Sequence, residues 1–358
     1  MSLPAIYRID VRGCSLLRRS AARLAVAIIL SSPGIAIAQA PPQTPPQAPQ
    51  QLRLASTPWS PFTDVAGKAR FAIDLVDEAL KRVGITAVTT IVDDGTLTPA
   101  LNSRRFDGSA ALWRDDERAR TLIYSDAYLE NRMLLVGRSG TDVSAKSLSV
   151  LAGKRLALVD GYSYGDAVTR GSGPTVVSSS SVEDSLQKVL ANAADYALVD
   201  ELVIESLIQR YPREVSARLA IATTPVLSRS LHFAIRRDLP GAQAIIDRFN
   251  GVLRSMVADR SYHRLLHIAW ISADIDGDGR TEYVPASDQA GTAPPDHGYK
   301  LFTGDDTEPR PAAQSQRYYV GGSLYEDWTR VPDAFKVQAA GTPAPMGGQT
   351  ASLFTIQW

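Results

Sequence analysis

Residues 99–130 read PALNSRRFDGSAALWRDDERARTLIYSDAYLE and combine a short helix, a buried strand, an acid/base cluster and an aromatic turn. We expect the helix at 97–103 and the strand at 108–113. Around this stretch, the hydrophobic pattern predicts strands at 52–55, 88–92, 133–137, 155–159, 194–199 and 230–235, and helices at 71–83, 182–191 and 201–209. This alternation predicts an α/β fold, with a mainly parallel sheet covered by helices and ligands bound at the carboxyl ends of the strands.

Three motifs in the stretch follow a recognisable order: FDG at 106–108, ER at 117–118 and YSDAY at 124–128. In these motifs the chain resembles the bacterial periplasmic solute-binding proteins of the amino-acid-binding type (family 3, type II periplasmic binding fold). The resemblance covers about residues 51–270. It implies two lobes joined by two hinge strands, with lobe 1 formed by 51–137 and 230–270 and lobe 2 by 138–229.

The resemblance also implies capture of a small polar, amino-acid-like ligand by lobe closure, for an ABC-type transporter. Arg118 matches the family arginine that binds the α-carboxylate, and Asp200 matches the aspartate that binds the α-ammonium. A free amino acid brings both charges into a desolvated cleft, so the site must supply a cation and an anion. The alternatives are a solvated Arg118 paired with a nearby acid, and an Asp200 that only caps the following helix.

The walls of the expected site are aromatic. Trp59 follows the first strand, where the resemblance implies a ring packed on the ligand, and core packing is its alternative. Trp113 replaces the threonine that usually helps to bind the carboxylate, so it either stacks on a flat or cationic ligand or closes the cleft. Tyr162 and Ser163 lie in a glycine-flanked turn whose amides could face a carboxylate. Because of Trp113, other small anions and amines stay open as ligands.

The N-terminus predicts export. Residues 1–40 combine five arginines and one acid, Asp10, with an apolar run at 24–38 and small residues near 40, which is typical of a signal peptide. Residues 41–50 are rich in Pro and Gln and predict a linker. We therefore expect a periplasmic protein that is not inserted in the membrane after cleavage. Cys14, the one cysteine, lies inside the signal, so no disulfide is expected.

Charge does not favour a nucleic-acid partner. Residues 1–40 hold five of the 38 basic and one of the 38 acidic residues, so the remaining chain has a net charge of about −4. A monomer is expected.

Residues 274–282 read DIDGDGRTE, in which alternating carboxylates could converge on one hard cation. We expect a structural calcium ion in a motif at 271–288, and an acidic surface turn is the alternative. A C-terminal extension of unknown role follows at 289–358, with a hairpin at 318–325. The expected ligands are Asp274, Asp276, Asp278, the backbone carbonyl of Arg280, and Glu282.

No catalytic residue or catalytic cofactor is predicted. The sequence has no H-E-x-x-H motif and no cysteine outside the signal. His263 and His267 are four residues apart and could share a metal, but their neighbours favour packing. The rival to a transport protein is a periplasmic sensory or accessory module that acts through a protein partner without transport. A dehydratase-like enzyme on the same fold is a further alternative.

Overall fold

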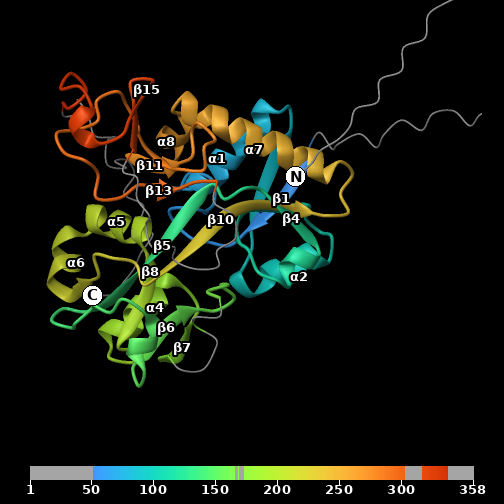
Figure 1. Cartoon of the computed structure of the whole chain (residues 1–358). Helices are drawn as coiled ribbons and strands as arrows, with labels where there is room; N and C mark the ends of the chain where they lie inside the picture. Colours follow the sequence, from blue (N-terminus) through green and yellow to red (C-terminus); the bar gives the residue numbers. More distant parts are fainter. Residues whose placement is uncertain (1–50, 166–167, 169–172, 303–316, 338–358) are drawn as a thin grey trace, which may run out of the picture. The chain divides into compact units, whose positions relative to one another are not determined.

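The computed structural model describes residues 51–165, 168, 173–302 and 317–337 (Figure 1). The expected signal peptide and linker, and the tail segments 303–316 and 338–358, lie outside the described residues. In the part that is described, no helix has both the length and the apolar character needed to cross a bilayer.

The main sheet has ten strands and contains the strands predicted before residue 236. Its order is β2-β1-β3-β10-β5-β8-β6-β7, with β4 paired to β10 and β9 paired to β5. The strands are β1 (Gln51–Ser56), β2 (Thr86–Ile91), β3 (Gly108–Trp113), β4 (Leu122–Tyr124), β5 (Leu129–Arg138), β6 (Arg155–Val159), β7 (Thr175–Ser179), β8 (Tyr196–Asp200), β9 (Leu219–Ile221) and β10 (Leu227–Arg236).

Strand direction divides this sheet into two lobes and a hinge. β1 is parallel to β2 and β3 in lobe 1, and β6 is parallel to β7 and β8 in lobe 2. The long strands β5 and β10 are antiparallel to each other and run side by side between the two groups (Figure 1). The two lobes and two hinge strands are thus confirmed. The prediction of a mainly parallel sheet was wrong for the sheet as a whole, because the hinge strands pair antiparallel with β3, β4, β8 and β9 as well as with each other.

Helices cover both lobes. α1, α7 and α8 pack on one another in lobe 1, and α4 packs on β6 and β8 in lobe 2. The α-helices of the described residues are α1 (Phe71–Arg82), α2 (Leu97–Asn102), α4 (Val182–Leu190), α5 (Glu201–Arg210), α6 (Pro212–Arg218), α7 (Ala242–Ala258) and α8 (Ser261–Leu266). Short 3₁₀ turns are η1 (Asp94–Thr96), η2 (Arg118–Arg120), η3 (Leu148–Leu151) and η4 (Trp328–Arg330).

The FDG motif holds β3 against its neighbours. The Asp107 carboxylate accepts a hydrogen bond of 2.9 Å from the backbone N–H of Arg53 in β1. At Gly108 a Cβ atom would lie 2.1 Å from the carbonyl oxygen of Ala234, so only glycine lets β10 approach β3 this closely. Downstream, the buried Tyr128 hydroxyl donates to the Ala110 carbonyl at 2.9 Å. These contacts explain why the stretch 99–130 fixes the centre of lobe 1.

The predicted 271–288 motif and the C-terminal extension together form a second sheet, in the order β13-β11-β12-β14-β15, and from here on both are called the extension. The predicted hairpin at 318–325 is confirmed as the last two strands of this sheet. Ile271, Tyr299 and Leu301 belong to the same buried core as the main sheet. The extension therefore packs on the binding fold. The strands of the second sheet are β11 (Trp270–Ala273), β12 (Glu282–Pro285), β13 (Tyr299–Lys300), β14 (Arg317–Val320) and β15 (Ser323–Tyr325).

Candidate ligand site

A small cavity lies where loops leave the carboxyl ends of β1, β3 and β6. Its volume is about 50 Å³. This position is the one expected for a ligand in an open α/β sheet. Five of the six predicted ligand-binding residues line it, while Asp200 does not. The lining residues are Thr57, Trp59, Leu97, Ala111, Leu112, Trp113, Arg118, Gly161, Tyr162 and Ser163.

Four rings, which we call the aromatic cluster, close the space between the lobes: Trp59 and Trp113 from lobe 1, and Tyr162 and Tyr164 from lobe 2. The Trp113 ring centroid is 5.5 Å from Trp59, 5.6 Å from Tyr162 and 5.5 Å from Tyr164, in edge-to-face arrangements. Such pairs each contribute about 0.5–1.5 kcal/mol beyond their burial. A cavity of this size holds a few water molecules, so a ligand as large as arginine would require the rings to separate.

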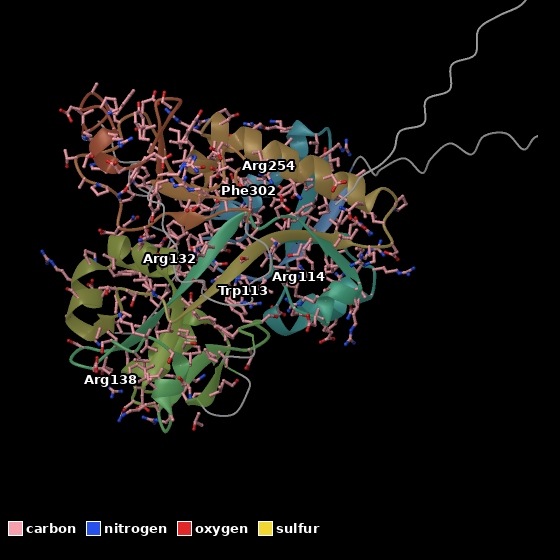
Figure 2. All side chains as sticks on the ribbon, viewed as in Figure 1. Trp113, Arg114, Arg132, Arg138, Arg254 and Phe302 are labelled. Atoms are coloured by element: carbon pink, nitrogen blue, oxygen red, sulfur yellow. The ribbon has the colours of Figure 1, made fainter. Side chains whose placement is uncertain are left out.

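Trp113 also has a polar anchor, and Figure 2 labels it beside the hinge strands. Its indole Nε1 donates a 2.7 Å hydrogen bond to Oδ1 of Asn131, a fully buried residue of β5. The amide of Asn131 in turn donates to Asp200 Oδ2 at 3.0 Å. Trp113 is thus tied to the hinge by a hydrogen bond as well as by ring contacts.

Arg118 places a positive charge on the cavity wall. Its Nη2 donates to the carbonyl oxygen of Gly161 in lobe 2 at 3.3 Å, and its Nε donates to Thr98 Oγ1 at 3.1 Å. Asp115 Oδ2 lies 3.2 Å from Arg118 Nε and accepts a 2.9 Å hydrogen bond from the Ser163 hydroxyl. The pairing of Arg118 with a nearby acid, which the sequence left open, is present. It places the guanidinium between the lobes, where a carboxylate could reach it.

Asp200 lies behind the aromatic cluster rather than on the cavity wall. Its Oδ1 accepts a 2.8 Å hydrogen bond from the backbone N–H of Leu202, so it caps α5. Burial raises the pKa of Asp200 to about 7, although the hydrogen bonds from Asn131 and the helix amides oppose the shift. Its predicted role toward an ammonium group stays a prediction.

The sequence analysis did not identify two residues of the site, Asn131 and Tyr164, which both contact Trp113. Asn131 could have been noticed as a polar residue within the apolar pattern of β5. One sequence motif was also missed. Residues 161–165, GYSYG, also have the spacing G-x-S-x-G of a serine nucleophile. Such a serine needs a histidine base, whereas the Ser163 hydroxyl donates to Asp115. The geometry therefore favours a binding role for this turn.

The two histidines considered for a metal make different contacts. Nε2 of His263 is 3.2 Å from the Val284 carbonyl oxygen in β12. The His267 ring lies 4.8 Å from the Phe71 ring. These contacts match the packing alternative, and they connect α8 to the extension and to α1.

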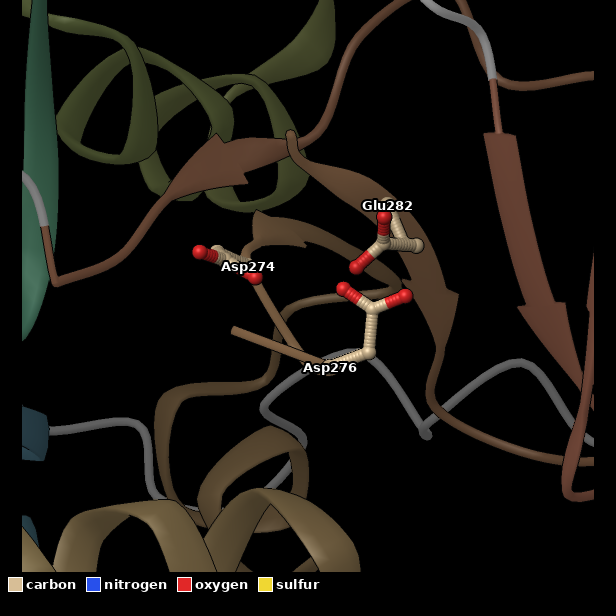
Figure 3. A group of neighbouring side chains, drawn as sticks. All are labelled: Asp274, Asp276 and Glu282. Atoms are coloured by element: carbon tan, nitrogen blue, oxygen red, sulfur yellow. The ribbon is translucent and has the colours of Figure 1, made fainter. Parts of the chain in front are cut away.

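The acidic loop brings three carboxylates together. Oxygens of Asp274, Asp276 and Glu282 lie within 4.8 Å of one another, and Figure 3 shows the last two facing each other. The Asp274 carboxylate folds the loop, because it accepts hydrogen bonds from the backbone N–H groups of Gly277 and Gly279 at 2.7 and 3.0 Å. Glu282 is fully buried and accepts from the Ile275 N–H at 2.9 Å. Oxygen donors of this kind suit a hard divalent cation.

A side-chain cation also reaches this loop. The buried Arg317 donates to Asp276 Oδ2 at 2.7 Å and to Asp278 Oδ2 at 2.6 Å, and its Nη1 lies 3.2 Å from Glu282 Oε1. The Arg280 side chain pairs with Glu326 at 3.3 Å, and its carbonyl was the predicted ligand. Arg317 supplies one positive charge against the four carboxylates of the motif, so the loop keeps a negative excess that a divalent ion would offset.

Comparison with known proteins agrees with this architecture. The two lobes, the paired hinge strands and the cavity at the strand ends define a binding protein of the type II periplasmic fold. The model of the bacterial extracellular solute-binding proteins, family 3, matches residues 54–272, and the chain belongs to this family. Proteins of this family act outside the cytoplasmic membrane, so the chain is an extracellular or periplasmic solute-binding protein. No curated protein sequence matches the chain.

Several solved structures share the fold. An ancestral arginine-binding protein bound to arginine has 24% sequence identity and a TM-score of 0.52, covering 61% of this chain and 97% of its own. A mutant of ArgBP from T. maritima has 22% identity and a TM-score of 0.51, with 61% and 94% covered. An arginine 3rd transport system periplasmic binding protein from Legionella pneumophila has 20% identity and a TM-score of 0.51, with 61% and 98% covered.

Proposed function

We propose that the chain captures a small polar, amino-acid-like molecule between its lobes and delivers it to an ABC-type transporter without chemical change. The observation that carries this proposal is the position of Arg118 on the cavity wall, with Nη2 turned toward the lobe 2 loop. A guanidinium there can bind a carboxylate through two parallel hydrogen bonds, which a lysine cannot do. The similar structures include an ancestral arginine-binding protein bound to arginine and a periplasmic binding protein of an arginine transport system, which supports the ligand class.

Ligand entry requires the aromatic cluster to open. Trp59 and Trp113 would stay with lobe 1 while Tyr162 and Tyr164 move away with lobe 2, because the rings belong to different lobes. The ligand would then replace ring-to-ring contacts with its own, and the Arg118 guanidinium would exchange the Gly161 carbonyl for the ligand carboxylate.

A thermal-shift and calorimetry screen of the full chain against amino acids, amines and small organic acids tests this function. We expect a carboxylate ligand to raise the melting temperature and Arg118→Lys to weaken its binding at least tenfold, since a charged hydrogen bond is lost. Arg120→Lys, an exposed arginine in the same turn, is the matched control. Unchanged binding by Arg118→Lys would contradict the proposed role of the guanidinium, and a failure of every carboxylate would contradict the ligand class.

The small volume of the cavity favours a second candidate function, a sensory or accessory module that acts through a protein partner without transport. In that case the aromatic cluster would stay closed and small molecules would leave the melting temperature unchanged. Size-exclusion chromatography with light scattering would show whether the purified chain is a monomer, as we propose. Product formation from the screened acids would instead indicate a dehydratase-like enzyme.

For the acidic loop we propose a structural calcium ion held by Asp274, Asp276, Asp278, Glu282 and the Arg280 carbonyl. What supports it is the convergence of three of the carboxylates and the negative excess that Arg317 leaves. The ion would stabilise the turn between β11 and β12 and has no proposed role in ligand capture.

A further inference from the structure

The segment His297–Phe302 of the extension contacts both lobes beside hinge strand β5. On the lobe 1 side, the backbone N–H of Phe302 donates to the Ala127 carbonyl at 2.8 Å. The Lys300 N–H donates to Glu130 Oε2 at 3.3 Å, and Lys300 Nζ lies 3.8 Å from Glu130 Oε1. In Figure 1, β13 lies beside the upper end of β5. This side of the segment is held by backbone and charged contacts together.

On the lobe 2 side, the same segment holds Glu201, the first residue of α5. The Tyr299 hydroxyl donates to Glu201 Oε2 at 3.0 Å, and His297 Nε2 lies 3.3 Å from that oxygen. Arg132 of β5 donates to it at 2.7 Å. Tyr299 is 6% exposed, so its hydrogen bond to the carboxylate is largely shielded from water.

The side chains of hinge strand β5 alternate between these contacts and the ligand site. Successive side chains of a strand point to opposite faces. Glu130 contacts Lys300 of the extension, and Arg132 contacts Glu201. Asn131 lies between them in the strand and bonds Trp113 on one side and Asp200 on the other. Bending of β5 at these residues would change both sets of contacts at once.

The strand pairing of β5 changes partner close to these residues. The first half of β5, up to Met133, pairs with β10, and the second half, from Met133, pairs with β8 of lobe 2. Lobe 2 can swing away from lobe 1 only if the strand flexes near this change of partner. Glu201 would then move away from Tyr299 and His297, because the segment stays paired with β11 and bonded to Ala127 of lobe 1.

We propose that the segment His297–Phe302 is a strap across the hinge that holds the lobes closed and thereby regulates opening of the aromatic cluster. Its regulatory meaning rests on the proposed capture function, but the restraint on the hinge does not. Opening requires the release of Glu201 by Tyr299 and His297, so the closed state is favoured even without a ligand.

Lobe separation can be measured directly by pulsed electron paramagnetic resonance. Spin labels at Val88→Cys and Val176→Cys, in a Cys14→Ser background of the full chain, report the distance between the outer strands β2 and β7, where both valines are exposed. The test variant is His297→Ala combined with Tyr299→Phe. We expect its long-distance population to rise about tenfold or more, because a hydrogen bond to a charged acceptor is lost.

Tyr325→Phe, in the outermost strand of the extension sheet, is the control and should leave the distance distribution unchanged. His297→Ala alone removes a side chain that is 34% exposed, so it should fold and shift the distribution in the same direction. An unchanged distribution in the folded double variant, or in His297→Ala if the double variant fails to fold, would overturn the strap. An equal shift in Tyr325→Phe would do the same. The distance measurement needs no ligand, so it tests the strap even if no ligand is found for the proposed capture function.

Discussion

Replacement of Trp113 should separate the two ways in which this side chain holds the closed site. Trp113→Ala removes three ring contacts and the Nε1 hydrogen bond to Asn131 from a residue that is 5% exposed. Truncation of a buried tryptophan to alanine lowers the free energy of unfolding by about 3–5 kcal/mol. Trp113→Phe keeps a ring and loses the donor, which leaves Asn131 Oδ1 without its indole partner. That loss should amount to about 1–3 kcal/mol.

Urea unfolding followed by circular dichroism measures both values, provided that the denaturant slope is unchanged. Val88→Ala, at an exposed position in β2, is the control and should stay within about 0.5 kcal/mol of the parent. The reasoning would be refuted if Trp113→Ala cost no more than Trp113→Phe, because ring contacts would then contribute nothing to closure. It would also be refuted if the alanine variant lost less than about 1 kcal/mol.

Three further predictions concern other parts of the molecule. Gly108→Ala should lower the free energy of unfolding by about 3 kcal/mol or more, because its Cβ would lie 2.1 Å from a backbone oxygen of β10. Gly95→Ala, where a Cβ meets nothing within 4 Å, is its control, and equal losses in urea titrations would disprove the steric argument. Burial lowers the pKa of His263 to about 4, so the unfolded chain binds a proton that the folded chain rejects as pH falls from about 6.5 to about 4. The free energy of unfolding should therefore fall by about 3 kcal/mol by pH 4. In His263→Gln the free energy of unfolding should change less between about pH 6.5 and pH 4, and the same pH dependence in both proteins would contradict the reasoning. Calcium at tenfold above its dissociation constant should raise the melting temperature by about 2–4 °C, chelator should reverse the rise, and Asp274→Asn should abolish it. Magnesium serves as the comparison ion, and the absence of any calcium shift would contradict the proposed structural ion.

The sequence predicted local elements more closely than contacts between them. Strands 108–113 and 155–159 were predicted to the residue, because a buried strand is a continuous apolar run bounded by turn residues. The resemblance placed Trp59, Arg118, Tyr162 and Ser163 in one site, and the structure brings them together. Each of these positions lies in the segment that follows the end of a strand.

The closure of the site could not be predicted in the same way. The path from Trp113 to Asp200 through Asn131 joins residues 18 and 69 positions apart in the chain, and hydrophobic periodicity carries no information about such pairs. The hairpin at 318–325 was visible as two short runs around a glycine pair. The sequence did not predict the contact between the extension and Glu201, because this contact depends on how the two sheets pack.

The small volume of the cavity has a kinetic consequence. A ligand larger than a few water molecules can enter only after the aromatic cluster separates, so its binding must begin from the fraction of molecules that is open at a given moment. The measured affinity is then the intrinsic affinity multiplied by that fraction, and if one molecule in a hundred is open, the apparent dissociation constant is about a hundred times weaker. The observed association rate would approach a ceiling, set by the opening rate, as ligand concentration increases. Stopped-flow tryptophan fluorescence would show this ceiling as a plateau.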